Sequence, residues 1–343
     1  SRGRALGMMA GLGTLGMITG SPGGGVLVDA FGWRAIFLGR LPLCLLGIAF
    51  ALVALRETKS AGSRAPYDLR GAVTLFVGMA SFILFVTLGG RDGWTLSYVL
   101  GLAALAVASM TVFARIERRA LRPILDLALL KHRVLAPALL AAFLVTVATF
   151  INWFILPFYV SDVIGASARA WGVLLMLQAL TSAVTAPVGG WLSDRAHPSH
   201  TITAAIAISA LAMFWFSTLD AQSTMADVAM RMIVAGVGMG VFQASNANLI
   251  MGSFARDRLG MGGAVMTLSR SLGTVSSVAI MGALFTARQA ARSGPSAVDD
   301  GAIDPPTFVL AFQDLYTVSA VLAALAVVAS LSYWPQTMRG RVR

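Results

Sequence analysis

The sequence predicts an all-α polytopic membrane protein with about ten transmembrane helices. Of its 343 residues, 57% are hydrophobic and only 12% are charged, whereas an ordinary soluble domain has about 25% charged residues. Apolar runs of about 20 residues, long enough to cross a bilayer as a helix, recur along the whole chain. The basic residues gather in alternate connectors between these runs, which is typical of a multi-pass topology.

Each predicted span is an apolar run that matches a hydrocarbon core about 30 Å thick. The runs lack the alternating pattern of strands, and a bilayer requires backbone polar groups to be paired within the segment, so helices are predicted. The ten spans are residues 6–28, 35–55, 69–90, 95–114, 134–160, 169–192, 201–219, 226–253, 259–287 and 308–334.

The lysines and arginines set the predicted orientation. Of 26 such residues, 18 lie in connectors on one side of the predicted membrane, five lie on the other side, and three lie inside spans. The positive-inside rule places the first side, and both ends of this chain, in the cytoplasm. We therefore expect a multi-pass protein of the cell (plasma) membrane whose surroundings are the lipid bilayer. The net charge of +11 is then a topology signal, and no nucleic-acid partner is expected.

The connectors divide the spans into blocks. A polar linker precedes the third and fourth spans, and the longest basic connector, "RIERRALRPILDLALLKHR", separates these from the last six. That connector has the pattern of an amphipathic segment on the membrane surface. The predicted blocks are residues 1–55, 56–114, 115–133 and 134–343.

The first span is unusually rich in glycine for a helix. Glycines four residues apart let another helix approach closely in lipid, and Pro22 removes a backbone donor and is expected to bend the helix. The stretch "GMITGSPGGG" resembles the antiporter motif in the fifth helix of the major facilitator superfamily. Ser21 stands where the family has proline, and Pro22 follows one residue later. The residues matched to the motif are Gly16, Gly20, Ser21, Pro22, Gly24 and Gly25.

The resemblance covers essentially the whole chain and is closest to the fourteen-helix drug/proton antiporter branch. It implies that 1–55 holds the last two helices of the N-terminal bundle and 56–114 a linker with two extra central helices. Residues 115–133 would then be the cytoplasmic connector and 134–343 the six-helix C-terminal bundle. It also implies that the chain lacks the first four helices, and with them the coupling carboxylate of the family.

Two further motifs resemble this superfamily. "GGWLSDRAHP" is similar to its cytoplasmic gating loop, which implies close helix approach at Gly190 and an ion pair or cap between adjacent helices formed by Asp194 and Arg195. "RMIVAGVGMG" is similar to its arginine–glycine helix pattern, with Gly236 and Gly240 as a close-packing pair. Its Arg231 either serves the pathway or reaches the interface by snorkelling.

Arg270 in "MTLSRSLGTVSS" lies too deep in its span to reach the interface easily. A charge at that depth is costly, so we expect it to face a watery cavity or a partner. Amide and aromatic side chains inside other spans either line the same cavity or hydrogen-bond neighbouring helices. They are Asn152, Trp153, Phe154, Gln178, Gln243, Asn246 and Asn248.

Taken together, these features predict a transporter without catalytic residues, metal site or cofactor. No Ser/His/Asp grouping, metal-ligand cluster or phosphate loop is present, which argues against an enzyme. The resemblance implies export of a drug-like small molecule in exchange for protons by alternating access, with a possible accessory periplasmic protein. The alternative is a truncated membrane scaffold or remnant without transport.

Overall fold

The computed structural model describes residues 2–54, 68–119, 133–195, 198–254, 259–293, 305–332 and 334, and it describes their side chains from Leu15 onward, except at residues 91 and 305. Every regular element in these ranges is a helix, so the predicted all-α class is confirmed. The amphipathic surface segment predicted within 115–133 lies mostly outside the described residues, as does most of the linker 56–68. The helices are α1 (Arg2–Phe31), α2 (Arg34–Ala54), α3 (Leu69–Asp92), α4 (Ser97–Glu117), α5 (Leu135–Thr149), α6 (Ile151–Phe154), α7 (Leu156–Phe158), η2 (Tyr159–Val163), α8 (Ala168–Arg195), α9 (Pro198–Phe216), α10 (Met225–Gly252), α11 (Leu259–Ser293) and α12 (Pro305–Leu331).

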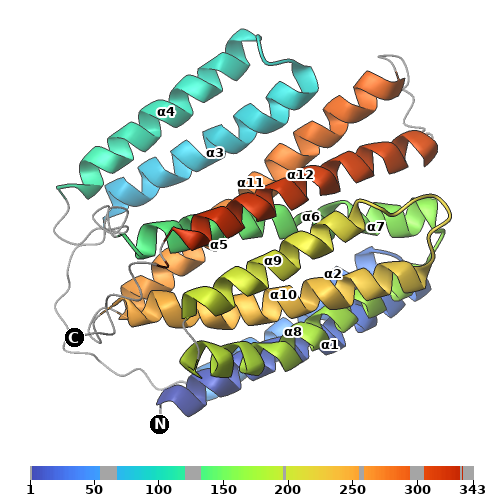
Figure 1. The fold of residues 1–343 in the computed structure, drawn as a ribbon, viewed down its shortest axis with the longest axis horizontal. Helices are drawn as coiled ribbons and strands as arrows, with labels where there is room; N and C mark the ends of the chain where they lie inside the picture. The colour runs from blue at the N-terminus through green and yellow to red at the C-terminus, as the bar shows by residue number, and fades with distance from the viewer. Residues whose placement is uncertain are drawn as a thin grey trace.

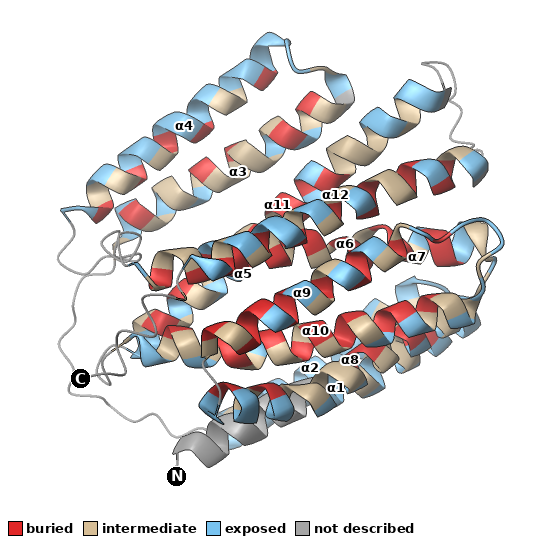
Figure 2. Ribbon diagram, in the orientation of Figure 1, coloured by how far each residue is buried: buried red, intermediate tan, exposed pale blue. Residues whose placement is uncertain are grey.

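The helices expose apolar side chains, as membrane helices do. Within the described residues, nine helical segments are long and apolar enough to cross a membrane, and the tenth predicted span, 6–28, lies within α1. Large side chains such as Leu43 and Phe50 on α2 are 68% and 74% exposed, and α2 has no buried residue at all. Figure 2 shows exposed residues along the outer faces and buried ones where helices meet. Such surfaces suit contact with lipid chains.

The helices from α5 to α12 form a bundle in which each packs beside a neighbour that is often distant in the chain. α8 packs on α10, α10 on α9, α9 on α12, α12 on α5, and α5 on α11 (Figure 1). The first span of this bundle, predicted as one helix over 134–160, is broken into α5, α6, α7 and a five-residue π-helical turn, η2. Pro157 sits at the start of α7 and lacks the N–H that a continuous helix would use, which accounts for an interruption there.

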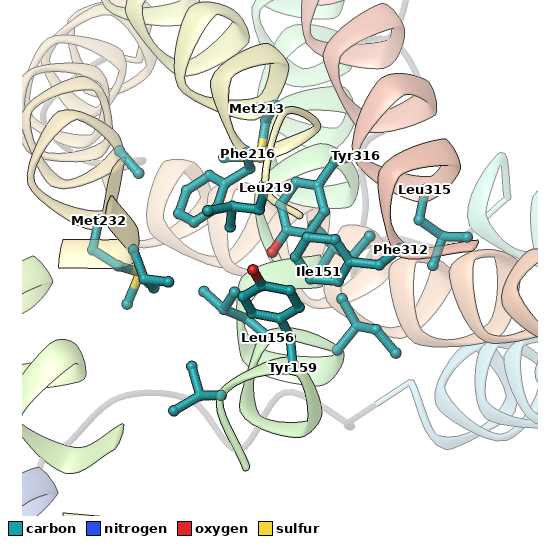
Figure 3. Packing of buried hydrophobic residues seen from close by; sticks show 14 of the residues in the cluster. Ile151, Leu156, Tyr159, Met213, Phe216, Leu219, Met232, Phe312, Leu315 and Tyr316 are labelled. Atoms are coloured by element: carbon teal, nitrogen blue, oxygen red, sulfur yellow. The ribbon is translucent and has the colours of Figure 1, made fainter. Parts of the chain in front are cut away.

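An aromatic cluster fills one end of this bundle. Phe312 of α12 stacks on Tyr159 of η2 at a ring-centroid distance of 4.6 Å and lies equally close to Tyr316, which stacks on Phe216 of α9 at 5.0 Å. The Tyr316 hydroxyl donates to Asn152 Oδ1 at 2.8 Å. Figure 3 shows these rings converging from three parts of the chain. Their burial holds the broken span against α9 and α12.

Two helical pairs flank the bundle on opposite sides (Figure 1). α1 runs along α8 and packs on α2, whereas α3 packs on α4 and on α11. On the α3 side, a Cβ built at Gly90 would lie 2.7 Å from the Ala283 Cβ of α11, so the two helices approach closely there. The bundle therefore presents α8 to one pair and α11 to the other. The boundaries predicted for the four blocks, residues 1–55, 56–114, 115–133 and 134–343, stay a prediction.

Candidate functional site

The seam between α1 and α8 is closest where a glycine of each helix faces the backbone of the other. A Cβ built at Gly25 would come within 2.5 Å of the Ala168 carbonyl oxygen. A Cβ built at Gly172 of α8 would meet the Ser21 carbonyl oxygen and lie 3.0 Å from the Pro22 Cα. No real side chain fits at such distances, so the two backbones are in direct contact. Glycine on both helices is what permits this approach in an apolar medium.

Of the predicted motif glycines, only Gly25 lies in this contact. No described atom lies within 4 Å of a Cβ built at Gly16, Gly20 or Gly24, and Gly16 and Gly20 are exposed. Among the described residues, these three glycines therefore take no part in the close contact with α8, and their role in the motif stays a prediction. The reason is helical periodicity: Gly25 is one residue, about 100°, around the helix from the face that the four-residue spacing shares.

Asp29 of α1, which the sequence did not indicate, links α1 to α8 at the same end of the seam. Its Oδ1 accepts a hydrogen bond from the Ala168 backbone N–H at 3.1 Å, and its Oδ2 accepts one from the Arg169 N–H at 3.0 Å. The first N–H groups of a helix have no partner within it and carry partial positive charge. The carboxylate of α1 therefore caps α8, a helix 139 residues further along the chain. Local spacing gives no signal of such a contact.

The seam between α8 and α10 is interlocked by the predicted glycine pair. A Cβ built at Gly236 would lie 2.8 Å from the Gln178 carbonyl oxygen, and one at Gly240 would lie 2.9 Å from the Ser182 Cα. One turn of helix separates the two glycines, so both contacts fall on the same face of α10. The structure thus places Gly236 and Gly240 at a close approach of two backbones, as their spacing predicts.

In the loop motif, the close approach occurs at Gly189 instead of the predicted Gly190. A Cβ built at Gly189 would lie 2.7 Å from the Val241 Cα, so α8 also presents a glycine to α10. No described atom lies within 4 Å of a Cβ built at Gly190. The two neighbours point about 100° apart on the helix, and only Gly189 faces α10.

Asp194 and Arg195, at the end of α8, form no ion pair between adjacent helices in the described part of the chain, although Asp194 does contact a neighbouring helix. Asn248 of α10 donates to Asp194 Oδ1 at 3.5 Å, a long contact that joins α8 to α10. The Arg195 guanidinium lies 4.3 Å from the ring centroid of Trp191, one turn earlier on its own helix. Asn248 therefore belongs to this helix end and is absent from the pocket described below.

Arg231 is buried in a corner where α10 meets the end of α9. Its Nε donates to the Trp215 carbonyl oxygen at 2.8 Å, Nη1 to the Asp227 carbonyl oxygen at 2.8 Å, and Nη2 to the Thr218 hydroxyl at 3.0 Å. Its guanidinium also stacks on the Trp215 ring, 4.8 Å from the centroid. A cation with this many partners at helix ends holds those ends together.

Arg270 lies in a different environment, at a pocket of about 120 Å³ between α5, α10 and α11. The structure brings Arg270 together here with Gln243 and Asn246, the two amides whose spacing predicts a shared helix face. Arg270 and Gln243 are exposed, whereas Asn246 is only 4% exposed. The pocket lining is Ala142, Thr146, Phe242, Gln243, Asn246, Met266, Thr267 and Arg270.

The remaining predicted cavity residues lie away from this pocket. Asn152 is buried among the aromatic rings, where it accepts the hydrogen bond from Tyr316 described above. Gln178 is buried on α8. Trp153 is 36% exposed, and Phe154 lies 3.7 Å from a Cβ built at Gly282 of α11. The sequence left two roles open for Asn152, lining a cavity or hydrogen-bonding a neighbouring helix. In the structure it hydrogen-bonds a neighbouring helix, α12.

Comparison with known sequences places this geometry in context. The sequence pattern of the Major Facilitator Superfamily matches residues 1–278 and 138–339, which together span nearly the whole chain. The chain is 26% identical over 275 residues to the multidrug transporter protein MdtP of Bacillus subtilis (strain 168), covering 80% of this chain and 51% of that protein.

Two further relatives come from other bacteria. The chain is 25% identical to the tetracenomycin C resistance and export protein of Streptomyces glaucescens, over 83% of this chain and 53% of that protein. It is 22% identical to the riboflavin transporter RibZ of Clostridioides difficile (strain 630), over 98% and 71% of the two chains. The chain spans about half the length of MdtP and of the tetracenomycin C protein.

Proposed function

The chain belongs to the Major Facilitator Superfamily, and we propose that it forms part of an exporter that moves drug-like small molecules out of the cell in exchange for protons. It is a multi-pass membrane protein by its fold and its family. Support for export comes from its likeness to proteins described as a multidrug transporter and as a resistance and export protein. Those descriptions belong to the relatives, and their activity is proposed here for this chain.

The observation that carries the proposal is the pocket around Arg270. It places a guanidinium and two amides together between three membrane-spanning helices of otherwise apolar composition. Polar and charged groups are costly inside a membrane, and where they gather around a cavity they mark a pathway for a polar solute. A structural role of the kind that Arg231 has would instead surround the guanidinium with acceptors.

The α1–α8 seam supports alternating access as the mechanism. In such a mechanism, two groups of helices rock about a central site and open it to one side of the membrane at a time. The positive-inside orientation puts the Asp29 end of α1 and the start of α8 at the outer face. The contact between Gly25 and Gly172, with the Asp29 cap beside it, would then hold the outer side closed.

Transport by everted membrane vesicles tests this proposal. Everted vesicles are prepared, with and without the protein, from cells that lack their own drug exporters. An acid-inside pH gradient is imposed to drive uptake, and either ethidium, a cation, or carboxyfluorescein, an anion, is added outside the vesicles. We expect accumulation of at least one dye that depends on the protein and disappears when a protonophore collapses the gradient. Should neither dye move while the protein is present in the membrane, export is wrong and the scaffold without transport remains.

A further inference from the structure

The two arginines inside the α10–α11 region differ in how their charges are balanced. Arg231 donates three hydrogen bonds and lies 3.9 Å from the Asp227 carboxylate. Arg270 forms no ion pair or hydrogen bond with any residue in the described part of the chain. It lies eleven residues past the first residue of α11, which is about 16 Å along the helix axis. No described residue therefore balances its charge, at a depth where an isolated charge is costly.

The other pocket residues offer neutral hydrogen-bonding groups around this cation. Gln243 and Asn246 contribute amides, whose N–H₂ groups are hydrogen-bond donors. Asn246 Oδ1 is buried without a hydrogen-bond partner among the described residues. Thr146 and Thr267 contribute hydroxyls. Among the described residues that line the pocket there is no carboxylate, and the one charged side chain is that of Arg270.

The size of the pocket suits one polar group of a ligand. About 120 Å³ is well below the 300–1,000 Å³ or so of sites that enclose a whole drug-sized molecule. It is about the space of four water molecules at roughly 30 Å³ each, which is enough for a carboxylate or a similar oxyanion. Phe242 and Met266 form apolar walls beside the guanidinium and would contact the carbon skeleton next to such a group.

We propose that this pocket binds the oxyanion of an amphiphilic organic anion, so that the exported molecules include aromatic or aliphatic carboxylates. A guanidinium binds a carboxylate through two parallel hydrogen bonds, and the pairing is strongest where water is largely excluded. A cationic ligand would be repelled by Arg270 at the same place. The inference rests on the proposed export function for its biological meaning, although binding can be measured separately.

Three probes that share one ring system test the charge preference directly. They are 2-naphthoate, its neutral amide 2-naphthamide, and the cation 2-naphthylmethylammonium. Their affinities are measured by titration calorimetry for the purified protein in an uncharged detergent. We expect naphthoate to bind at least about tenfold more tightly than the amide, because a hydrogen bond to a charged group contributes that much or more. The cation is expected to bind most weakly.

Three variants assign the preference to its cause. Arg270→Gln is expected to make naphthoate and naphthamide bind equally. Arg270→Lys keeps the positive charge that the fold already accommodates but loses the two parallel donors of the guanidinium. It should therefore weaken the binding of naphthoate several-fold and leave the binding of naphthamide unchanged. Arg288→Gln removes the same charge from the far part of α11, where Arg288 is half exposed and 3.8 Å from Asp314, and should leave all three affinities unchanged.

The outcomes separate this inference from the proposed function. Equal binding of the three probes by the unsubstituted protein, or tightest binding of the cation, overturns the anion site, and so does a preference that survives Arg270→Gln. An anion preference without dye movement in the vesicles overturns export and leaves the binding site standing. Proton-dependent movement of ethidium alone, with no anion preference in binding, leaves export standing and removes the substrate class.

Discussion

The two seams that α8 forms, one with α10 and one with α1, are built from the same residue type but differ in extent. Against α10, glycines from both helices make close contacts around the middle of α10, at Gly189, Gly236 and Gly240. Against α1, the glycine contacts that the described residues make lie at one end, at Gly25 and Gly172. A seam interlocked at mid-helix resists relative movement, whereas one joined at an end is able to open there. The first is therefore expected to hold one bundle together and the second to part during transport.

The largest effect is expected from filling the α8–α10 seam. Gly240→Leu would drive a side chain into the backbone at Ser182, and overpacking of this kind costs about 3 kcal/mol. We expect a large fall in the midpoint temperature of the detergent-solubilised protein and loss of the monodisperse peak in size-exclusion chromatography. Gly190→Leu is the matched control, because open space surrounds that position in the described structure. Equal tolerance of both changes would show that the seam is not interlocked.

A smaller and more local effect is expected from filling the α1–α8 seam. Gly25→Leu would collide with Ala168 and Arg169, so the seam should open at that end while the α8–α10 bundle stays folded. The measurement is the labelling rate of Ala168→Cys by an impermeant maleimide added outside the cell, in a Cys44→Ser background. We expect a rise of about tenfold with Gly25→Leu and none with Gly24→Leu. Labelling that occurs only from the cytoplasmic side would contradict the assigned orientation.

Removing the carboxylate cap should open the same end by less. Asp29→Ala deletes both acceptors at the start of α8, and the loss of a helix cap costs about 1 kcal/mol, equivalent to about a fivefold change in an equilibrium. The Ala168→Cys labelling rate is expected to rise by about that factor. Asp162→Asn serves as the control, because Asp162 is exposed and accepts its hydrogen bond from the neighbouring Ser161. If both variants label alike, the cap does not hold the seam.

The sequence predicts these seams unevenly. Long apolar runs are enough to locate the spans, since a helix that crosses a bilayer needs about 20 such residues wherever it packs. The spacing of Gly236 and Gly240 marks a contact, but in α1 the same four-residue spacing marks a face on which no described residue packs closely. Which face meets a neighbour depends on the whole bundle and is not a property of one helix.

The same limit applies to the charged residues. The sequence separates Arg231 from Arg270 only by their depth in the predicted spans. The structure adds that acceptors supplied by the end of α9 surround the first, whereas the second faces a pocket. The contact of Asp29 with α8 joins residues far apart in the chain, so no local pattern contains it. Gln243 and Asn246 were predictable as neighbours on one helix face, whereas their meeting with Arg270 needed the packing of α10 against α11 and α5.

The smallest effect is expected on the glycine face of α1 that makes no contact in the described structure. Gly20→Ala adds a methyl group into open space, and alanine is favoured over glycine inside a helix by about 0.5–1 kcal/mol. The midpoint temperature should therefore stay constant or rise slightly, and the same holds for Gly16→Ala. A clear fall would mean that another segment packs on this face through its glycines. The face would then be a third seam, and the contrast between the two seams of α8 would no longer by itself decide where the protein moves.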